Sequence, residues 1–167
     1  MPLFSGEMIL EKEIKAIVEA YPADVRHALA IMQDLQQRFN HIPREALAVI
    51  AGHTKSSAAH LYALATFYKA LSLKPKGRHI IKICDGTACH IHGAANLMDC
   101  IRRELSISPG ETTADGEFSL ETVNCLGACA IAPVVVIGKT YYGKMTPEKL
   151  PQILDIYRMG AKKEAGA

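Results

Sequence analysis

The chain has 167 residues, of which 49% are hydrophobic and 22% charged, which is enough for a packed core beneath a water-facing surface. Its net charge of +2 gives no electrostatic support for nucleic-acid binding, and its longest apolar stretch, residues 128–137, is too short to span a bilayer. Five cysteines without a secretory-signal pattern argue against a disulfide framework. We therefore expect reduced thiols, a cytoplasmic location and no direct membrane insertion.

The first 72 residues are predicted to form a small helical bundle, because apolar residues recur there at helical spacing. Asp24 and either Ser56 or Ser57 are candidate helix caps. Tyr62, Phe67 and Tyr68 lie at helical spacing and are expected in the core of the bundle. No catalytic constellation is found in this part of the sequence, so we expect a docking module. The predicted helices cover residues 10–21, 24–39, 43–51 and 56–68.

Residues 73–78 have the composition of a linker, and the pattern then changes to α/β over residues 79–160, followed by a tail at 161–167. A helix is expected over residues 91–105, and a last helix begins either at Thr146-Pro147 or at Pro151. Gly138 suits the first position of a type II′ turn between the last two strands. The predicted strands are residues 79–84, 118–123, 133–137 and 140–142.

Four cysteines follow the ends of predicted strands in two glycine-bearing loops, Cys84-x4-Cys89 and Cys125-x3-Cys129. Two irons bridged by two sulfides need four thiolates, which two such loops can supply. Neither spacing is the C-x-x-C of a thioredoxin-type catalyst. A structural zinc site remains open, because four thiolates also satisfy zinc, although zinc loops are commonly tighter. The spacing favours an iron–sulfur cluster over zinc.

Three further side chains near these loops are not expected to be ligands. Cys100 lies eleven residues beyond Cys89, or about 16 Å along a helix, so it is interpreted as an ordinary helix cysteine. His90 and His92 suggest Rieske-type ligation, but that would require displacing two of four available cysteines. We expect both histidines at the surface or around the site.

The residues around both cysteine pairs resemble the cluster loops of the thioredoxin-like [2Fe–2S] ferredoxins. The matching segments are Cys84-Asp-Gly-Thr-Ala-Cys89-His-Ile-His-Gly-Ala94 and Val123-Asn-Cys125-Leu-Gly-Ala-Cys129-Ala-Ile-Ala-Pro-Val-Val-Val136. The resemblance includes the 24 kDa-type subunit of NADH dehydrogenase and the small subunits of NAD-linked hydrogenases and formate dehydrogenases. It implies a thioredoxin-like domain, one [2Fe–2S] cluster on the four cysteines, and a cis peptide before Pro133. His92 departs from the family, where arginine is common.

The same resemblance implies a flavoprotein partner that binds FMN and NAD, with this chain as a non-catalytic electron-transfer subunit. The sequence itself has no G-x-G-x-x-G motif or phosphate loop for a nucleotide. Backbone amides of Gly86, Thr87, Gly127 and Ala128 are expected to hydrogen-bond the sulfurs. The rival functions are a free-standing ferredoxin and a zinc-stabilised interaction module.

Overall fold

The computed structural model describes the backbone of residues 4–164 and the side chains of residues 10–159. The chain divides into two compact units, Met1–Pro75 and Lys76–Ala167, and each has a hydrophobic core of its own. The division falls within residues 73–78, the segment whose composition suggests a linker.

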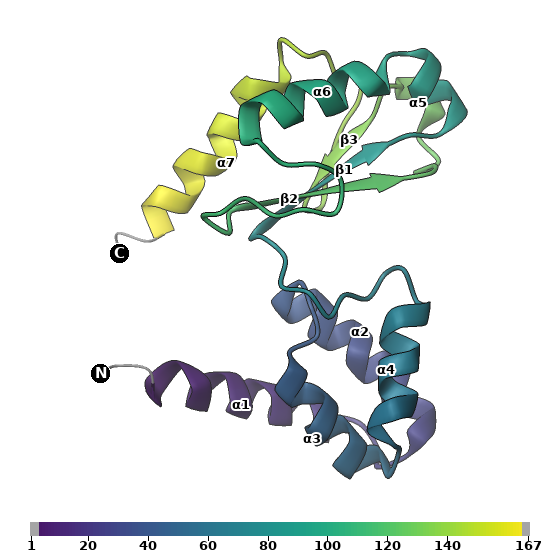
Figure 1. Ribbon diagram of the computed structural model, residues 1–167, viewed down its shortest axis with the longest axis vertical. Helices are drawn as coiled ribbons and strands as arrows, with labels where there is room; N and C mark the ends of the chain where they lie inside the picture. The colour runs from purple at the N-terminus through teal and green to yellow at the C-terminus, as the bar shows by residue number, and fades with distance from the viewer. Residues whose placement is uncertain (1–3, 165–167) are drawn as a thin grey trace. The chain divides into compact units, whose positions relative to one another are not determined.

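The described part of the first unit is helical, as the apolar spacing predicts (Figure 1). Ser57 caps α4 by accepting a hydrogen bond from the amide of His60 at 3.2 Å. Asp24 accepts one from the amide of Arg26 at 2.8 Å, so it caps the 3-10 turn that precedes α2 rather than α2 itself. The elements are α1 (Phe4–Glu19), η1 (Val25–His27), α2 (Ala28–Phe39), α3 (Arg44–Thr54) and α4 (Ala58–Phe67).

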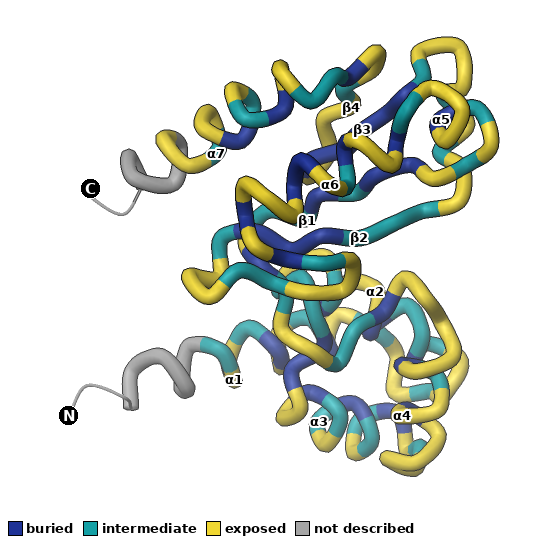
Figure 2. Tube along the Cα trace, turned by 45° about the horizontal axis from the view of Figure 1, so that its top comes forward, coloured by how far each residue is buried: buried dark blue, intermediate teal, exposed yellow. Residues whose placement is uncertain are grey.

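Three aromatic side chains in and directly after α4 lie at the surface, which corrects the expectation that they join the core. Figure 2 colours much of α4 as exposed. Phe67 is 80% exposed and Tyr62 57% exposed, and Tyr68 is also exposed. Leu61 and Ala65 face the core instead. The prediction failed because α4 is apolar around most of its circumference, so helical spacing alone does not say which side is inward.

The second unit is built on a four-stranded sheet of order β2-β1-β3-β4, which confirms the α/β class (Figure 1). β1 and β2 are parallel, with Cys84 opposite Val123, whereas β3 is antiparallel to both β1 and β4. Gly138, with φ of 61°, makes the tight turn between β3 and β4 at the predicted place. The strands are β1 (His79–Cys84), β2 (Phe118–Val123), β3 (Val135–Ile137) and β4 (Thr140–Tyr142).

Helices complete this unit, and two of them differ from the predicted bounds. The helix expected over residues 91–105 begins at Ala94 instead, because Gly93 adopts a left-handed conformation with φ of 92° and separates it from a short helix that ends at Ile91. The last helix begins beside Pro151 and not at Pro147. It continues through residues 161–164 of the predicted tail. Residues 165–167 lie outside the described residues. The helical elements are α5 (Thr87–Ile91), α6 (Ala94–Leu105), η2 (Cys129–Ile131) and α7 (Leu150–Glu164).

The core of the second unit lies between the sheet and the helices α6 and α7, which also pack against each other. The predicted cis peptide between Ala132 and Pro133 is confirmed. Among the described helices, none combines the length and apolar character that a membrane span requires. Fully buried side chains of this core include Ile81, Ile83, Leu97, Ile101, Phe118 and Leu154.

Candidate metal centre

The two cysteine loops leave the same edge of the sheet. Because β1 and β2 are parallel, their carboxyl ends lie side by side, and Cys84 ends one strand where Val123 ends the other. The amide of Asp85 donates to the carbonyl of Val123 at 2.8 Å, and the amide of Cys84 donates to the carbonyl of Val134 at 3.1 Å. These bonds tie the first loop to both flanks of the second.

Gly86 lets the two loops touch. A Cβ added at this position would overlap the carbonyl oxygen of Asn124 and approach the Cβ of Cys125 to 3.4 Å. The same Asn124 carbonyl lies 3.6 Å from the Sγ of Cys84. Only glycine permits this backbone approach, so the glycine of the first loop fixes the position of the second.

The first pair of thiols is buried, with Cys84 3% and Cys89 1% exposed. Burial raises the pKa of Cys84, but hydrogen bonds from the Gly86 amide, the Cys89 thiol and the Leu126 amide outweigh it, so that pKa lies below its usual value. Burial and the hydrogen bond with Cys84 raise the pKa of Cys89, against a smaller opposing effect of the Val134 amide. Cys84 is therefore the thiol of this pair that more readily carries negative charge.

The second pair is exposed, and its two Sγ atoms lie 3.8 Å apart. Gly127 turns the loop between them with φ of 74°, and its amide donates to the Sγ of Cys125 at 3.4 Å. The hydrogen bond with Cys125, and then the charge of Cys125, raise the pKa of Cys129. Sulfurs bound to one tetrahedral metal at about 2.3 Å are about 3.8 Å apart, so this pair has the separation of two ligands on one ion.

The two pairs are neighbours, and their charges interact. The charge of Cys129 adds to the other causes that raise the pKa of Cys89, and the charge of Cys84 acts in the same way on Cys129. Among residues with described side chains, no three His, Cys, Asp or Glu residues gather around a single point as ligands of one metal ion. The thiols form two neighbouring pairs on loops that touch, and two pairs of thiolates match the ligand requirement of two irons.

The four amides expected near the sulfurs all belong to the two cysteine loops. The amide of Gly86 donates to Cys84 and that of Gly127 to Cys125. Thr87 begins α5 and Ala128 precedes η2. Sequence reasoning missed the amide donors Leu126 and Val134. A backbone donor leaves no mark on residue type, so no sequence signal pointed to them.

The remaining candidates lie outside this arrangement. His90 makes an exposed hydrogen-bond contact with Asp85, with its Nδ1 3.1 Å from the carboxylate, and His92 ends α5. Cys100 is buried in α6, and its Sγ lies 3.4 Å from the carbonyl oxygen of Pro147. Burial raises the pKa of the Cys100 thiol. Its position agrees with the prediction of an ordinary helix cysteine.

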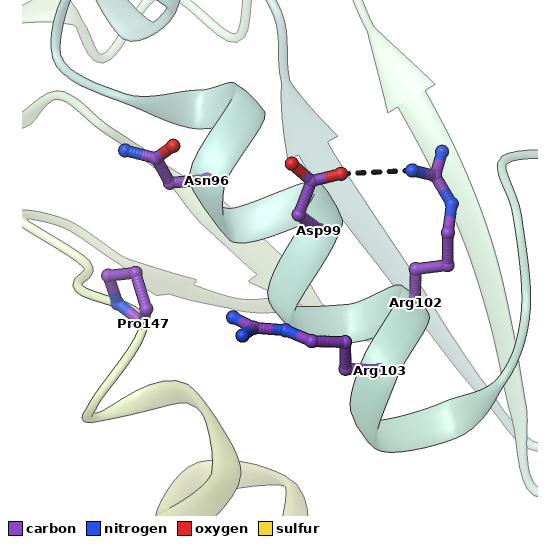
Figure 3. Close-up of a pocket in the computed structure, with 5 residues that line it drawn as sticks. All are labelled: Asn96, Asp99, Arg102, Arg103 and Pro147. Atoms are coloured by element: carbon purple, nitrogen blue, oxygen red, sulfur yellow. Dashed lines mark hydrogen bonds and ion pairs between the residues drawn. The ribbon is translucent and has the colours of Figure 1, made fainter.

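A groove of about 530 Å³ runs beside α6, away from the four thiols. In Figure 3 the side chain of Arg102 reaches Asp99, with a nitrogen–oxygen distance of 2.9 Å, and the guanidinium of Arg103 points toward the turn that carries Pro147. Asn96 completes the polar lining. No sulfur lines this groove, so it is separate from the cysteine site.

The geometry agrees with the comparisons to known proteins. The profile of the thioredoxin-like [2Fe–2S] ferredoxins matches residues 14–158. The chain is 34% identical over 148 residues to the HndA protein of the NADP-reducing hydrogenase of Solidesulfovibrio fructosivorans, covering 89% of this chain and 86% of the relative. It is 38% identical over 145 residues to a subunit of the NADH-quinone oxidoreductase of Rickettsia bellii, covering 85% and 87%.

A solved NAD+-reducing [NiFe]-hydrogenase in the air-oxidised state shares the fold, with a TM-score of 0.69 and 22% identity. The match covers 80% of this chain but spans only 23% of the hydrogenase chain.

Fold and site together define an iron–sulfur electron carrier, with four thiols in two neighbouring pairs at the edge of a small α/β domain. The chain belongs to the thioredoxin-like [2Fe–2S] ferredoxin family. The predicted family, its thioredoxin-like fold, its [2Fe–2S] cofactor and its electron-transfer role are thereby confirmed. Its relatives are subunits of oxidoreductase complexes.

Proposed function

We propose that Cys84 and Cys89 hold one iron of the [2Fe–2S] cluster and that Cys125 and Cys129 hold the other. We further propose that the chain exchanges single electrons with the flavin of an NAD(P)H-oxidising partner subunit, in a cytoplasmic oxidoreductase complex. The observation that carries the proposal is the arrangement of the thiols as two pairs on touching loops, one pair with its Sγ atoms 3.8 Å apart. When bound, the cluster supplies a one-electron redox couple.

The protein's own groups act on the sulfurs in two opposing ways. Amides of Gly86, Leu126 and Val134 point at the first pair, and the amide of Gly127 points at Cys125. These donors stabilise negative charge on sulfur and thus favour the reduced state. Burial of Cys84 and Cys89 acts in the opposite direction, because a low dielectric disfavours added charge. The exposed second pair offers the route by which electrons enter and leave.

We assign electron transfer to this chain and nucleotide binding to its partner because of the motifs in the sequence. It has no dinucleotide fingerprint and no phosphate loop, so hydride transfer from NAD(P)H and the binding of FMN are assigned to the partner. Relatives named as subunits of a hydrogenase and of an NADH-quinone oxidoreductase support a role inside a complex rather than as a free-standing ferredoxin. The helical first unit, which has no cluster ligand, is proposed to dock.

Anaerobic purification of the full chain, alone and with its FMN-binding partner, tests the proposal. We expect about two irons and two acid-labile sulfides per chain, as the cluster type requires. NADH or NADPH should bleach the visible absorbance of the cluster only when the partner is present. Stoichiometric zinc without labile sulfide would contradict the cluster ligands, and oxidation of NADH by the flavin-free chain would contradict the division of labour.

A further inference from the structure

The segment Gly143–Met145, here called the strap, binds the far end of the second cysteine loop. The amide of Lys144 donates to the carbonyl of Ile131 at 2.7 Å. The amide of Met145 donates to the carbonyl of Pro133 at 3.1 Å. Ile131 ends η2, the 3-10 turn that starts with the last cysteine of the loop. The strap therefore fixes the backbone that follows the exposed cysteine pair.

The strap is itself held in place by the second unit. Before it, β4 ends at Tyr142 and pairs with the buried strand β3 (Figure 2). Within it, the side chain of Met145 is 4% exposed and belongs to the core. Lys144 adopts a left-handed conformation with φ of 49°, which is uncommon for a residue with a side chain and persists where the surrounding structure determines it. The strap is thus a fixed support rather than a free loop.

Gly143 leaves room for the side chain of Ile131. A Cβ added at Gly143 would lie 2.6 Å from the Cβ of Ile131 and 2.7 Å from its Cδ1. Rotation about χ1 of Ile131 moves Cδ1 but not Cβ, so the overlap is relieved only if the backbone of the strap or of η2 moves. The φ of Gly143 lies outside the left-handed region, so this contact, and not backbone freedom, explains the glycine.

A movement of η2 would reach both cysteine pairs. The turn begins at Cys129, whose Sγ lies 3.8 Å from that of Cys125. Beyond the turn, the carbonyl of Val134 accepts from the amide of Cys84, and the amide of Val134 donates to the sulfur of Cys89. The backbone that the strap holds lies between Cys129 and Val134, so a shift there would displace groups on both loops.

We infer that Gly143 is a positioning residue for the iron–sulfur cluster. Its lack of a side chain lets the strap hold Ile131 in place, and η2 passes that position on to the Sγ of Cys129. Groups that support a metal ligand influence both metal affinity and reduction potential. The inference rests on the proposed ligation by Cys129, and it adds a support that lies outside both cysteine loops.

A role of Gly143 in the stability of the β3–β4 hairpin alone predicts different results. Gly138 turns the same hairpin with φ of 61°, and nothing lies within 4 Å of a Cβ added there. Gly138→Ala should therefore destabilise the hairpin through its positive φ but leave η2 in place. It is the matched control for Gly143→Ala.

The test uses the full-length, cluster-loaded chain, purified anaerobically. Gly143→Ala should speed the loss of iron to a chelator about tenfold or more, the scale on which losing a group that supports a ligand weakens metal binding. It should also shift the midpoint potential and the paramagnetic resonance spectrum of the reduced cluster. Gly138→Ala should change the rate of iron loss less than about twofold and leave that spectrum unchanged, because its Cβ meets no atom that supports the cluster.

A second variant removes the atoms that the new Cβ would meet. In an Ile131→Gly background, Gly143→Ala should change the rate of iron loss less than about twofold, as expected when two substituted sites no longer touch. Far-ultraviolet circular dichroism shows whether each variant is folded. If Gly143→Ala alone does not fold, the double variant should still fold and keep its cluster.

An unchanged spectrum, potential and rate of iron loss in folded Gly143→Ala would overturn the inference. Equal effects of Gly138→Ala, or the same loss in the Ile131→Gly background, would also overturn it. A double variant that does not fold, while Ile131→Gly alone does, would assign Gly143 to the fold instead. These results leave the proposed function standing, whereas zinc without labile sulfide in the wild type would overturn the proposed ligation itself.

Discussion

The two cysteine loops have the same chemistry but very different surroundings. Cys84 and Cys89 are almost completely buried, at the end of a central strand and inside a short helix. Cys125 and Cys129 are exposed, on a loop that turns through a left-handed glycine into a single 3-10 turn. The first loop is thus part of the folded core, whereas the second lies over it.

This difference suggests how a small domain can hold a metal cluster and still let electrons out. A site buried on all sides would be well ordered but remote from any partner, whereas a wholly exposed site would lack fixed ligand geometry. Here Gly86 brings the loops into contact, so the buried pair sets the position of the exposed pair. The predictions below test this asymmetry.

The largest effect is expected from serine substitutions at the ligands. Loss of a contact that supports a metal ligand lowers affinity by up to roughly 100-fold. Cys84→Ser and Cys89→Ser remove a ligand itself, and a buried loop cannot move to compensate. These variants should therefore lower cluster affinity by more than that. Cys125→Ser and Cys129→Ser should also change the cluster severely but retain more of it, since a solvated loop can shift toward a serine oxygen. Iron content and visible spectra of anaerobically purified protein measure this.

Cys100→Ser is the control for these variants and should leave the spectrum unchanged, because Cys100 contacts Pro147 rather than the other thiols. Equal or greater cluster loss at the exposed pair would contradict the prediction that the buried pair is the more sensitive one.

The second effect concerns thiol protection after the metal is removed. In anaerobic apoprotein under native conditions, Cys125 and Cys129 should react with iodoacetamide about tenfold or more faster than Cys84 and Cys89. The buried thiols react only when the structure opens locally, and an opening free energy of about 1.4 kcal/mol or more gives that factor. Mass spectrometry of peptides at successive times measures the rates. Equal rates would mean that the cluster, and not the polypeptide, creates the buried environment.

The third effect separates two glycines of the loops. Gly86→Ala should lower the free energy of unfolding by about 1–3 kcal/mol, because the new Cβ overlaps the Asn124 carbonyl and pushes the loops apart. Gly127→Ala is the matched control, since nothing lies within 4 Å of its added Cβ, and it should cost only about 1 kcal/mol for its positive φ. Urea unfolding of the apoproteins measures both. A larger cost at Gly127 would contradict the role of Gly86 as the contact between the loops.

Sequence reasoning identified both loops because strand ends and cysteine spacing are local features. β1, β2 and β4 have the predicted bounds, and the loops follow the strands as expected. The break at Gly93 was missed, because a glycine inside an apolar helical pattern does not reveal that it will adopt a left-handed conformation.

The different burial of the two cysteine pairs could not be predicted. It depends on which side of each loop meets the core, and that is decided by distant residues such as Val134, whose carbonyl accepts from the amide of Cys84. The exposed Phe67 illustrates the same limit in the first unit, where an apolar helix face is covered only if another element packs on it.

The smallest effect is expected from the contact between the side chains of Asp85 and His90, at the first loop. Both side chains are largely exposed, at 40% and 65%, so water and salt screen their attraction. Asp85→Asn and His90→Ala should therefore each change the free energy of unfolding by less than about 0.5 kcal/mol, as is typical of surface pairs. Burial of the two thiols and the backbone bonds to Val123 and Val134 hold the loop instead. Urea unfolding at low and at moderate salt measures this. A loss above about 1.5 kcal/mol, more than exposed pairs contribute, would show that a surface charge pair orders the buried loop.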